Sequence, residues 1–344
     1  MFSDLHLHNW SYGATYEGPW NSRLLDQRKV GEQILALAEL HRVEAVVFCG
    51  DLFHTHGRVE AGPLKVASEL FRALRDGYRK VYALVGNHDL GRETNSVDWM
   101  KGLGIKIVDE AMVDTELEIG MAAYTDNKEV LNTRLKFLKE HPLKYWFLHQ
   151  GVTNVMVGTD FVIPNEIFGE EDLPIDGPFI SAFTGHYHSH RRITEKLMII
   201  GSPMQFNWSD KGELRGCHIL DTWNNDCKMY PLHAPHFIEL DEVLNLTRHH
   251  TSIGPDQFES VRDAFVRIKG NVPLAFMEDI RKLLIGGGAR SVEFVVKKEL
   301  PTTGIFEESS FDLGALINKY IKVNEVDRAG ENALHLIMED PKCS

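Results

Sequence analysis

The 344-residue chain has few cysteines, fewer basic than acidic residues, and no long apolar run. Its four cysteines are scattered and form no C-x-x-C pair, which excludes a disulfide framework and is typical of the reducing cytosol. Against 37 Lys and Arg residues stand 50 Asp and Glu residues, so the net charge is −13. This balance excludes a surface that is basic all over, as in a simple nucleic-acid-coating protein, although a local basic groove remains open.

The longest apolar runs, such as residues 45–49 and 197–200, are far shorter than the roughly 20 residues that span a bilayer. Asp4 and His6 interrupt the first residues before an apolar stretch could form, so we expect no signal peptide. These absences together favour a cytoplasmic protein without a membrane segment.

The length allows about two domains at roughly 150 residues per domain. Helical and strand patterns alternate through the first 240 residues, and many strands are continuous apolar runs, as in parallel sheets. We expect helices at 22–41, 61–76, 97–102 and 128–140, and strands at 43–49, 81–85, 105–108, 117–124, 145–148, 180–184, 197–200, 217–221 and 228–232. The pattern predicts a large α/β domain with mixed sheets over residues 1–240.

A smaller unit is predicted over residues 241–305. It contains a strand at 264–268, a helix at 274–284 that starts after Pro273, and a strand at 291–297. Residues 306–344 are predicted to form a polar linker and amphipathic helices, in which Leu313, Leu316, Ile317 and Tyr320 share a face. That face either packs back on its own domain or binds a partner.

The 17 histidines are the informative part of the composition. Short stretches rich in metal-ligand residues each follow or end a predicted strand: Asp4-Leu5-His6, Gly50-Asp51, Gly86-Asn87-His88-Asp89, Leu148-His149 and Gly185-His186-Tyr187-His188. Because the carboxyl ends of strands in an α/β sheet converge on one crevice, these side chains are expected to meet.

Each stretch also has an ordinary reading. An isolated Asp-x-His or Gly-Asp is usually a turn, and Gly-His-x-His can be a structural pair. Gly-Asn-His-Asp directly after an apolar strand is more specific, and the whole ordered set predicts a metal site. Carboxylate, imidazole and amide ligands without cysteine suit Mn²⁺, Fe²⁺, Zn²⁺ or Mg²⁺.

In this order the motifs resemble those of the calcineurin-like metallophosphoesterases. Within that superfamily, Gly50-Asp51-Leu52-Phe53-His54 and the later Gly201-Ser202-Pro203-Met204-Gln205 resemble the SbcD-type double-strand-break repair nucleases. The resemblance covers residues 1–240 by specific motifs and extends to about residue 300 by architecture only. It implies a sandwich of two mixed β-sheets flanked by helices, a small α/β capping domain at 241–305, and a helical partner-binding tail at 306–344.

The resemblance also implies two divalent ions, with Mn²⁺ the first choice and Mg²⁺ the alternative. One ion would be held by Asp4, His6, Asp51 and His188, and the other by Asp51, Asn87, His149 and His186. His88 would be the general acid, Asp89 would orient it, and His54 would either help to steer the phosphate or serve a structural role.

Two features of the sequence each allow two interpretations. Only Met1, Phe2 and Ser3 precede Asp4, so either the family's first strand is almost missing or the chain begins inside a longer product. Trp10, Tyr12, Tyr16 and Trp20 crowd the following loop, where they either pack together or stack on unpaired bases.

The function that the resemblance implies is that of a two-metal DNA nuclease subunit acting on double-stranded ends and single strands in recombination, repair or degradation. It would work with an SbcC-type ABC ATPase, as a homodimer within a heterotetramer, in a prokaryotic or phage-infected cell. The alternative is a calcineurin-like phosphodiesterase or phosphatase that acts on small or nucleotide substrates.

Overall fold

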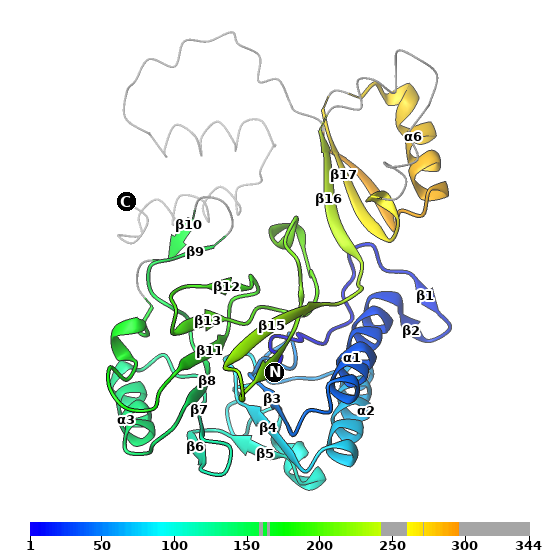
Figure 1. Cartoon of the computed structure of the whole chain (residues 1–344). Coiled ribbons are helices and arrows are strands. Elements are labelled where there is room, and N and C mark those ends of the chain that lie inside the picture. The colour runs from blue at the N-terminus through cyan, green and yellow to red at the C-terminus, as the bar shows by residue number, and fades with distance from the viewer. Residues whose placement is uncertain (158–160, 164–165, 242–259, 271, 296–344) are drawn as a thin grey trace, which may run out of the picture. The chain divides into compact units, whose positions relative to one another are not determined.

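The computed structural model describes residues 1–157, 161–163, 166–241, 260–270 and 272–295 (Figure 1). The predicted tail at 306–344 lies outside these described residues. None of the helices among them is both long enough and apolar enough to cross a membrane.

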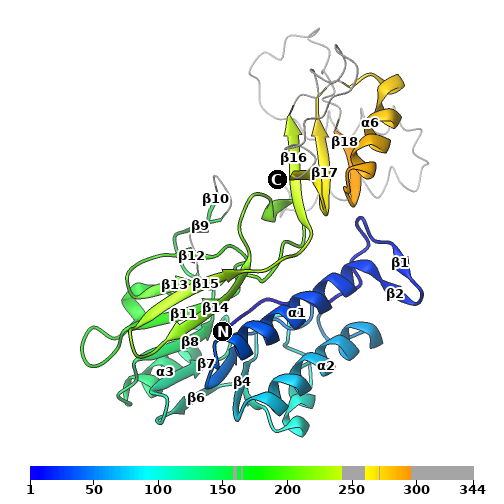
Figure 2. The ribbon, with the colours of Figure 1, turned by 45° about the vertical axis from the view of Figure 1, so that its right-hand side comes forward.

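The first sheet is built by the N-terminal βα units. Its parallel strands are β3 (Ala45–Phe48), β4 (Lys80–Leu84) and β5 (Lys106–Val108). Helices α1 (Ser22–Leu40) and α2 (Ala61–Gly77) lie side by side next to this sheet (Figure 2). Asn21 begins α1, because its side chain accepts hydrogen bonds from the backbone N–H groups of Arg23 and Leu24.

Met1 and Phe2 extend this sheet beyond β3. Phe2 pairs in parallel with Phe48 of β3, and Met1 exchanges two backbone hydrogen bonds with His218 of β14, at 2.7 and 2.9 Å. The hairpin of β14 (Gly216–Asp221) and β15 (Asp226–Pro231) is thereby joined to β3-β4-β5. The resulting sheet contains both parallel and antiparallel pairs.

The second sheet has the strand order β12-β13-β11-β8-β7-β6. These strands are β6 (Ala111–Asp114), β7 (Ile119–Ala122), β8 (Tyr145–His149), β11 (Ser181–Gly185), β12 (Arg191–Arg192) and β13 (Leu197–Ile199). The central strands are parallel and the edge strands β6 and β12 are antiparallel. Helix α3 (Lys128–Lys139) packs on β6 and β7, with Leu131, Leu135 and Leu138 buried.

An apolar core joins the two sheets. Val47 and Tyr82 of the first sheet are buried in one cluster with Tyr145, Phe147 and Phe183 of the second. The prediction of a sandwich of two mixed sheets flanked by helices is therefore confirmed.

A separate three-stranded parallel sheet follows, with β16 (His236–Asp241), β17 (Ala264–Lys269), β18 (Ser291–Val295) and helix α6 (Leu274–Gly286). It has its own apolar core, which includes Val266, Ile268, Ile280 and Leu284. Strand β16 was not expected from the sequence; it ends at residue 241, at the expected boundary, and pairs with β17. The division into domains at 240 and 305 stays a prediction.

Small differences concern short elements. Residues expected as a helix at 97–102 form a 3₁₀ helix, Asp98–Leu103, and the four-residue edge strand β6 was not predicted. Two-residue hairpin strands β1 (Tyr16–Glu17) and β2 (Trp20–Asn21) precede α1, and β9 (Val155–Val157) pairs with β10 (Phe161–Ile163).

Candidate metal centre

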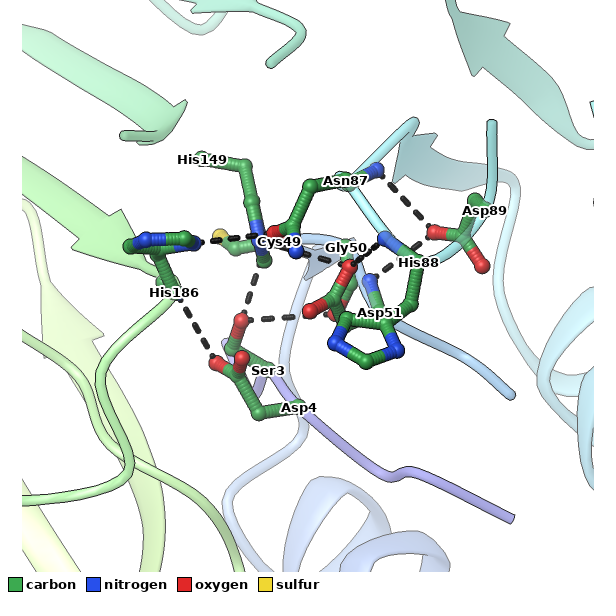
Figure 3. A network of polar contacts seen from close by, with 12 residues as sticks. Ser3, Asp4, Cys49, Gly50, Asp51, Asn87, His88, Asp89, His149 and His186 are labelled. Atoms are coloured by element: carbon green, nitrogen blue, oxygen red, sulfur yellow. Dashed lines mark hydrogen bonds and ion pairs between the residues drawn. The ribbon is translucent and has the colours of Figure 1, made fainter. Parts of the chain in front are cut away.

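The predicted ligand residues gather where central strands of both sheets end. Asp51 follows β3, Asn87 follows β4, His149 is the last residue of β8, and His186 follows β11. Figure 3 shows these side chains together with Asp4, which lies in the loop after Phe2. Residues from distant parts of the chain thus face one another at the carboxyl ends of the strands, as the topology predicts.

The backbone carrying these ligands is unusual. Asp4, His6, Asp51 and His186 have positive φ angles of 53°, 41°, 60° and 90°. Non-glycine residues seldom adopt this region, and such conformations concentrate at functional sites. Gly86 allows a close approach of the backbone, because a Cβ there would lie 2.2 Å from the Asp51 Oδ1 atom.

In one half of the site, two imidazoles converge on an amide oxygen. Asn87 Oδ1 lies 3.0 Å from His149 Nε2 and 2.9 Å from His186 Nδ1. The Nδ1–H of His149 donates to the Cys49 carbonyl at 2.6 Å, so the lone pair of a neutral His149 is on Nε2. That lone pair faces Asn87 Oδ1 and, at 3.4 Å, Asp51 Oδ1, an arrangement that needs either a proton or a cation between the electron-rich atoms.

Two residues that the sequence analysis missed hold His186. The Tyr124 ring stacks on the imidazole, with centroids 5.7 Å apart and an interplanar angle of 23°. Glu166 Oε1 lies 3.9 Å from His186 Nε2 and accepts a hydrogen bond from the Tyr187 hydroxyl at 2.8 Å. The His186 ring therefore has Nε2 toward Glu166 and Nδ1 toward Asn87.

In the other half, potential ligand atoms of Asp4, His6 and His188 lie within 4.8 Å of one another. His6 Nε2 lies 3.8 Å from Asp4 Oδ1 and 3.7 Å from Asp51 Oδ2. Asp4 Oδ1 is buried without a hydrogen-bond partner, and burial raises the pKa of this carboxyl. A buried carboxylate oxygen without a donor fits a cation-binding site.

His188 is held by a residue outside the motifs. Its Nδ1 atom lies 3.5 Å from Asp210 Oδ1, and the same carboxylate pairs with Arg215 at 3.0 Å. Asp210 also accepts the backbone N–H of Phe206 at 2.8 Å. The signal for Asp210 in the sequence is its position five residues after the 201–205 stretch, which resembles the SbcD-type nucleases.

Asp51 connects the two halves. Its Oδ1 faces His149 and its Oδ2 faces His6, and it belongs with Asp4 and His149 to a further group of potential ligands. Burial alone would raise the pKa of Asp51, but the His149 and His6 imidazoles hold it well below its usual range. The carboxylate is therefore ionised and has one oxygen directed to each half.

His88 lies beside this carboxylate with one ring nitrogen occupied. Its backbone N–H donates to Asp51 Oδ1 at 2.9 Å, and its Nδ1–H donates to the His54 carbonyl at 2.7 Å. The ring is thereby oriented through Nδ1, and this hydrogen bond leaves Nε2 available.

The predicted role of Asp89 as the orienting partner of the His88 ring is wrong. The Asp89 carboxylate is fully buried and accepts the backbone N–H groups of Asp51, Leu52 and Gly86 at 2.9–3.0 Å. Burial, together with the Asp51 charge, raises the pKa of Asp89 to about 6. Because its carboxylate accepts N–H groups from both segments, Asp89 links the loop after β3 to the loop after β4. The His54 carbonyl, and not Asp89, orients the His88 ring.

The His54 ring is half-buried in an aromatic cluster. It packs against Trp10, with centroids 4.3 Å apart, and stacks on His88 at 5.7 Å and 20°. Burial and the neighbouring imidazoles lower the pKa of His54 to about 4, so the ring is neutral near pH 7. Trp10 and Trp20 pack against the apolar core, whereas Tyr16 is 73% exposed.

The donor set as a whole fits divalent cations. Asp4 and Asp51 bring two carboxyl groups into a buried space where the other candidate ligands are imidazoles and one amide. Burying such a cluster is costly unless positive charge accompanies it. Oxygen and imidazole ligands are those that Mn²⁺, Zn²⁺ and Fe²⁺ accept.

Comparison with known proteins agrees with this geometry. Residues 1–197 match the family model of calcineurin-like phosphoesterases. The chain is 25% identical over 264 residues to the SbcD subunit of the nuclease SbcCD from Bacillus subtilis (strain 168), covering 63% of this chain and 65% of that protein. It is 26% identical over 186 residues to a phosphoesterase-like protein, 078R, of Invertebrate iridescent virus 3, covering 51% of each.

The matches thus span between half and two thirds of the length of these curated relatives. The family match itself covers more than half of this chain and contains all the predicted ligand residues. The chain therefore belongs to the calcineurin-like phosphoesterase family.

Proposed function

We propose that this protein is a two-metal-ion nuclease subunit that hydrolyses phosphodiester bonds at DNA ends. The observation that carries the proposal is the pair of ligand groups joined by Asp51, next to a His88 ring whose Nε2 atom is available. One ion is assigned to Asp4, His6, Asp51 and His188, and the other to Asp51, Asn87, His149 and His186.

Mn²⁺ is the proposed metal, with Mg²⁺ as the alternative. When bound, two divalent ions supply positive charge for the phosphoryl group and lower the pKa of a water molecule. His88 Nε2 carries the proton that the leaving oxygen receives, while the His54 carbonyl keeps the ring in place. The His54 ring stacks on His88, a position from which it can contact the phosphate.

The proposed partner is an SbcC-type ABC ATPase, bound by a homodimer of this chain in DNA recombination, repair or degradation in the cytoplasm. The similarity to the SbcD subunit of a nuclease supports this assignment. A net charge of −13 is compatible with it if the partner supplies most of the basic surface for DNA phosphates. The proposed partner-binding tail at 306–344 lies outside the described residues.

A second candidate is a phosphodiesterase or phosphatase for small or nucleotide substrates. The acidic charge favours it, because duplex affinity depends on Lys and Arg contacts to phosphate. The same metal centre would serve both reactions, so the substrate separates them.

One assay distinguishes the candidates. The purified chain with Mn²⁺ is given linear duplex DNA, single-stranded DNA or bis-p-nitrophenyl phosphate, with and without the co-expressed ATPase, and the His88→Ala variant is the control for contaminating nucleases. Cleavage of DNA that the ATPase stimulates supports the nuclease. Turnover of only the small diester, unchanged by the ATPase, favours the second candidate.

A further inference from the structure

The backbone N–H groups of the loop that carries Asp4 and His6 are hydrogen-bonded to the segment that carries Asp51. The backbone N–H groups of Asp4, His6 and Leu7 donate to the carbonyls of Gly50, Asp51 and Leu52 at 2.8–3.1 Å. The carbonyls of Leu5 and His6 are left to find donors elsewhere. Since Leu5 and His6 are buried, those carbonyls need partners from the protein.

One side chain from helix α1 supplies them. Gln27 Nε2 donates to Leu5 O at 3.0 Å and to His6 O at 2.9 Å. Its Oε1 accepts the backbone N–H of His8 at 3.1 Å. Gln27 is only 2% exposed, and these contacts use both of its N–H groups and its carbonyl.

We propose that Gln27 is a positioning residue of the first metal site, whose role is to hold the loop of Asp4 and His6 in its ligand-presenting conformation. The inference rests on the proposed two-metal function. Both ligand residues have positive φ angles, so the loop needs support from outside to stay in this conformation. Among side chains of this length, glutamine offers two N–H donors and one carbonyl acceptor. An ionised glutamate offers no donor, and methionine offers no donor and only a weak sulfur acceptor.

This role differs from simple filling of the core. The side chain of Gln27 contacts no predicted ligand atom; it acts through the backbone on both sides of His6. Its loss should therefore weaken metal binding at Asp4, His6 and His188. The second group, on Asn87, His149 and His186, receives no hydrogen bond from Gln27 and should be spared.

The test compares Gln27→Met, Gln27→Glu and a matched control on the same helix, Gln33→Met. Gln33 makes a similar pair of 2.8 Å hydrogen bonds to the backbone of His233, away from the metal centre. Binding of Mn²⁺ to the metal-free proteins is followed by calorimetry, and their thermal unfolding is measured without metal.

We expect one of two Mn²⁺ sites to weaken about 10- to 100-fold in both Gln27 variants, as for other residues that orient metal ligands, with the other site unchanged. Gln27→Glu keeps the size and the acceptor for His8, so it carries the test should Gln27→Met fold poorly. Gln33→Met should bind both ions as the wild type does.

Unchanged affinities in the Gln27 variants would overturn this inference alone. Equal weakening of both sites, in step with a lower unfolding temperature, would reduce Gln27 to a structural residue. A wild-type protein that binds fewer than two ions would instead overturn the proposed function, and the inference with it.

Discussion

The two halves of the metal centre are organised in different ways. In the half that contains Asn87, His149 and His186, the side chains touch one another, and His149 is the last residue of a regular strand. In the half that contains Asp4 and His6, the ligands lie on a loop outside the named strands, and Asp4 Oδ1 and His6 Nδ1 have no hydrogen-bond partner.

This difference indicates which contacts hold the ligand side chains of each half in place. His149 is fixed by its own hydrogen bond to Cys49, and His186 by stacking on Tyr124, so little rearrangement is needed when an ion binds. The first half depends on supporting residues such as Gln27 and Asp210. We therefore expect the first half to bind its ion more weakly and to be the more sensitive to changes in its supports.

The largest effect is expected where the halves meet. Asp51→Ala should weaken both metal sites at once and abolish activity, because its two oxygens face His149 and His6. Asn87→Ala should mainly weaken the second site. Calorimetric Mn²⁺ titration of both variants tests this, and loss of a single site in Asp51→Ala would show that the carboxylate does not bridge.

A second variant separates metal binding from chemistry. His88→Ala should keep both ions and lose about 10²- to 10⁴-fold in cleavage rate, the usual contribution of a general acid. His56→Ala is the matched control, because this exposed imidazole stacks on His88 at 4.4 Å yet belongs to neither ligand group. Metal content and turnover of bis-p-nitrophenyl phosphate are the readouts, and loss of an ion from His88→Ala would make it a ligand.

The supports of the first half can be tested through Asp210. Asp210→Asn should lower Mn²⁺ affinity of that half by about 10- to 100-fold, because the carboxylate orients His188. Glu213→Gln is its control, since Glu213 pairs with the same Arg215 without reaching His188. If both variants lose affinity equally, the general charge of the region matters rather than the contact to His188.

The smallest effect concerns the second half. Tyr124→Leu should cost about 0.5–1.5 kcal/mol of ring stacking on His186, or about 2- to 12-fold in affinity for one ion. Tyr124→Phe keeps the ring and should bind as the wild type does. A loss in Tyr124→Leu as large as that in Asp210→Asn would contradict the expectation that the first half is the more sensitive to changes in its supports.

Much of the fold could be predicted from local patterns. The apolar run at β4 and the amphipathic pattern of α2 are visible in the sequence because buried strands and one-sided helices need those residues. The strands β6 and β16 were missed, since most of their residues are only partly buried and give little periodicity; both form by pairing with β7 and β17.

The candidate ligands were also within reach of the sequence. Donor residues such as Asp51 and Asn87 stand directly after apolar strands, and that position alone brings them to one edge of a sheet. The role predicted for Asp89 was wrong because adjacency in sequence to His88 says nothing about where a buried carboxylate points. The Asp89 carboxylate accepts hydrogen bonds from backbone N–H groups, including those of Asp51 and Leu52.

The sequence by itself determined the alternation of strands and helices and the kinds of ligand atoms at the strand ends, because both follow from local burial and side-chain chemistry. Only the tertiary structure decided which residues support those ligands. Gln27, Asp210 and Tyr124 act on ligands that are more than 20 residues away in the sequence. Their contacts exist only once the fold brings α1 to His6, the segment after β13 to His188, and the segment after β7 to His186. Hydrogen bonds and ring contacts depend on distances of a few ångströms, which no spacing in the sequence encodes.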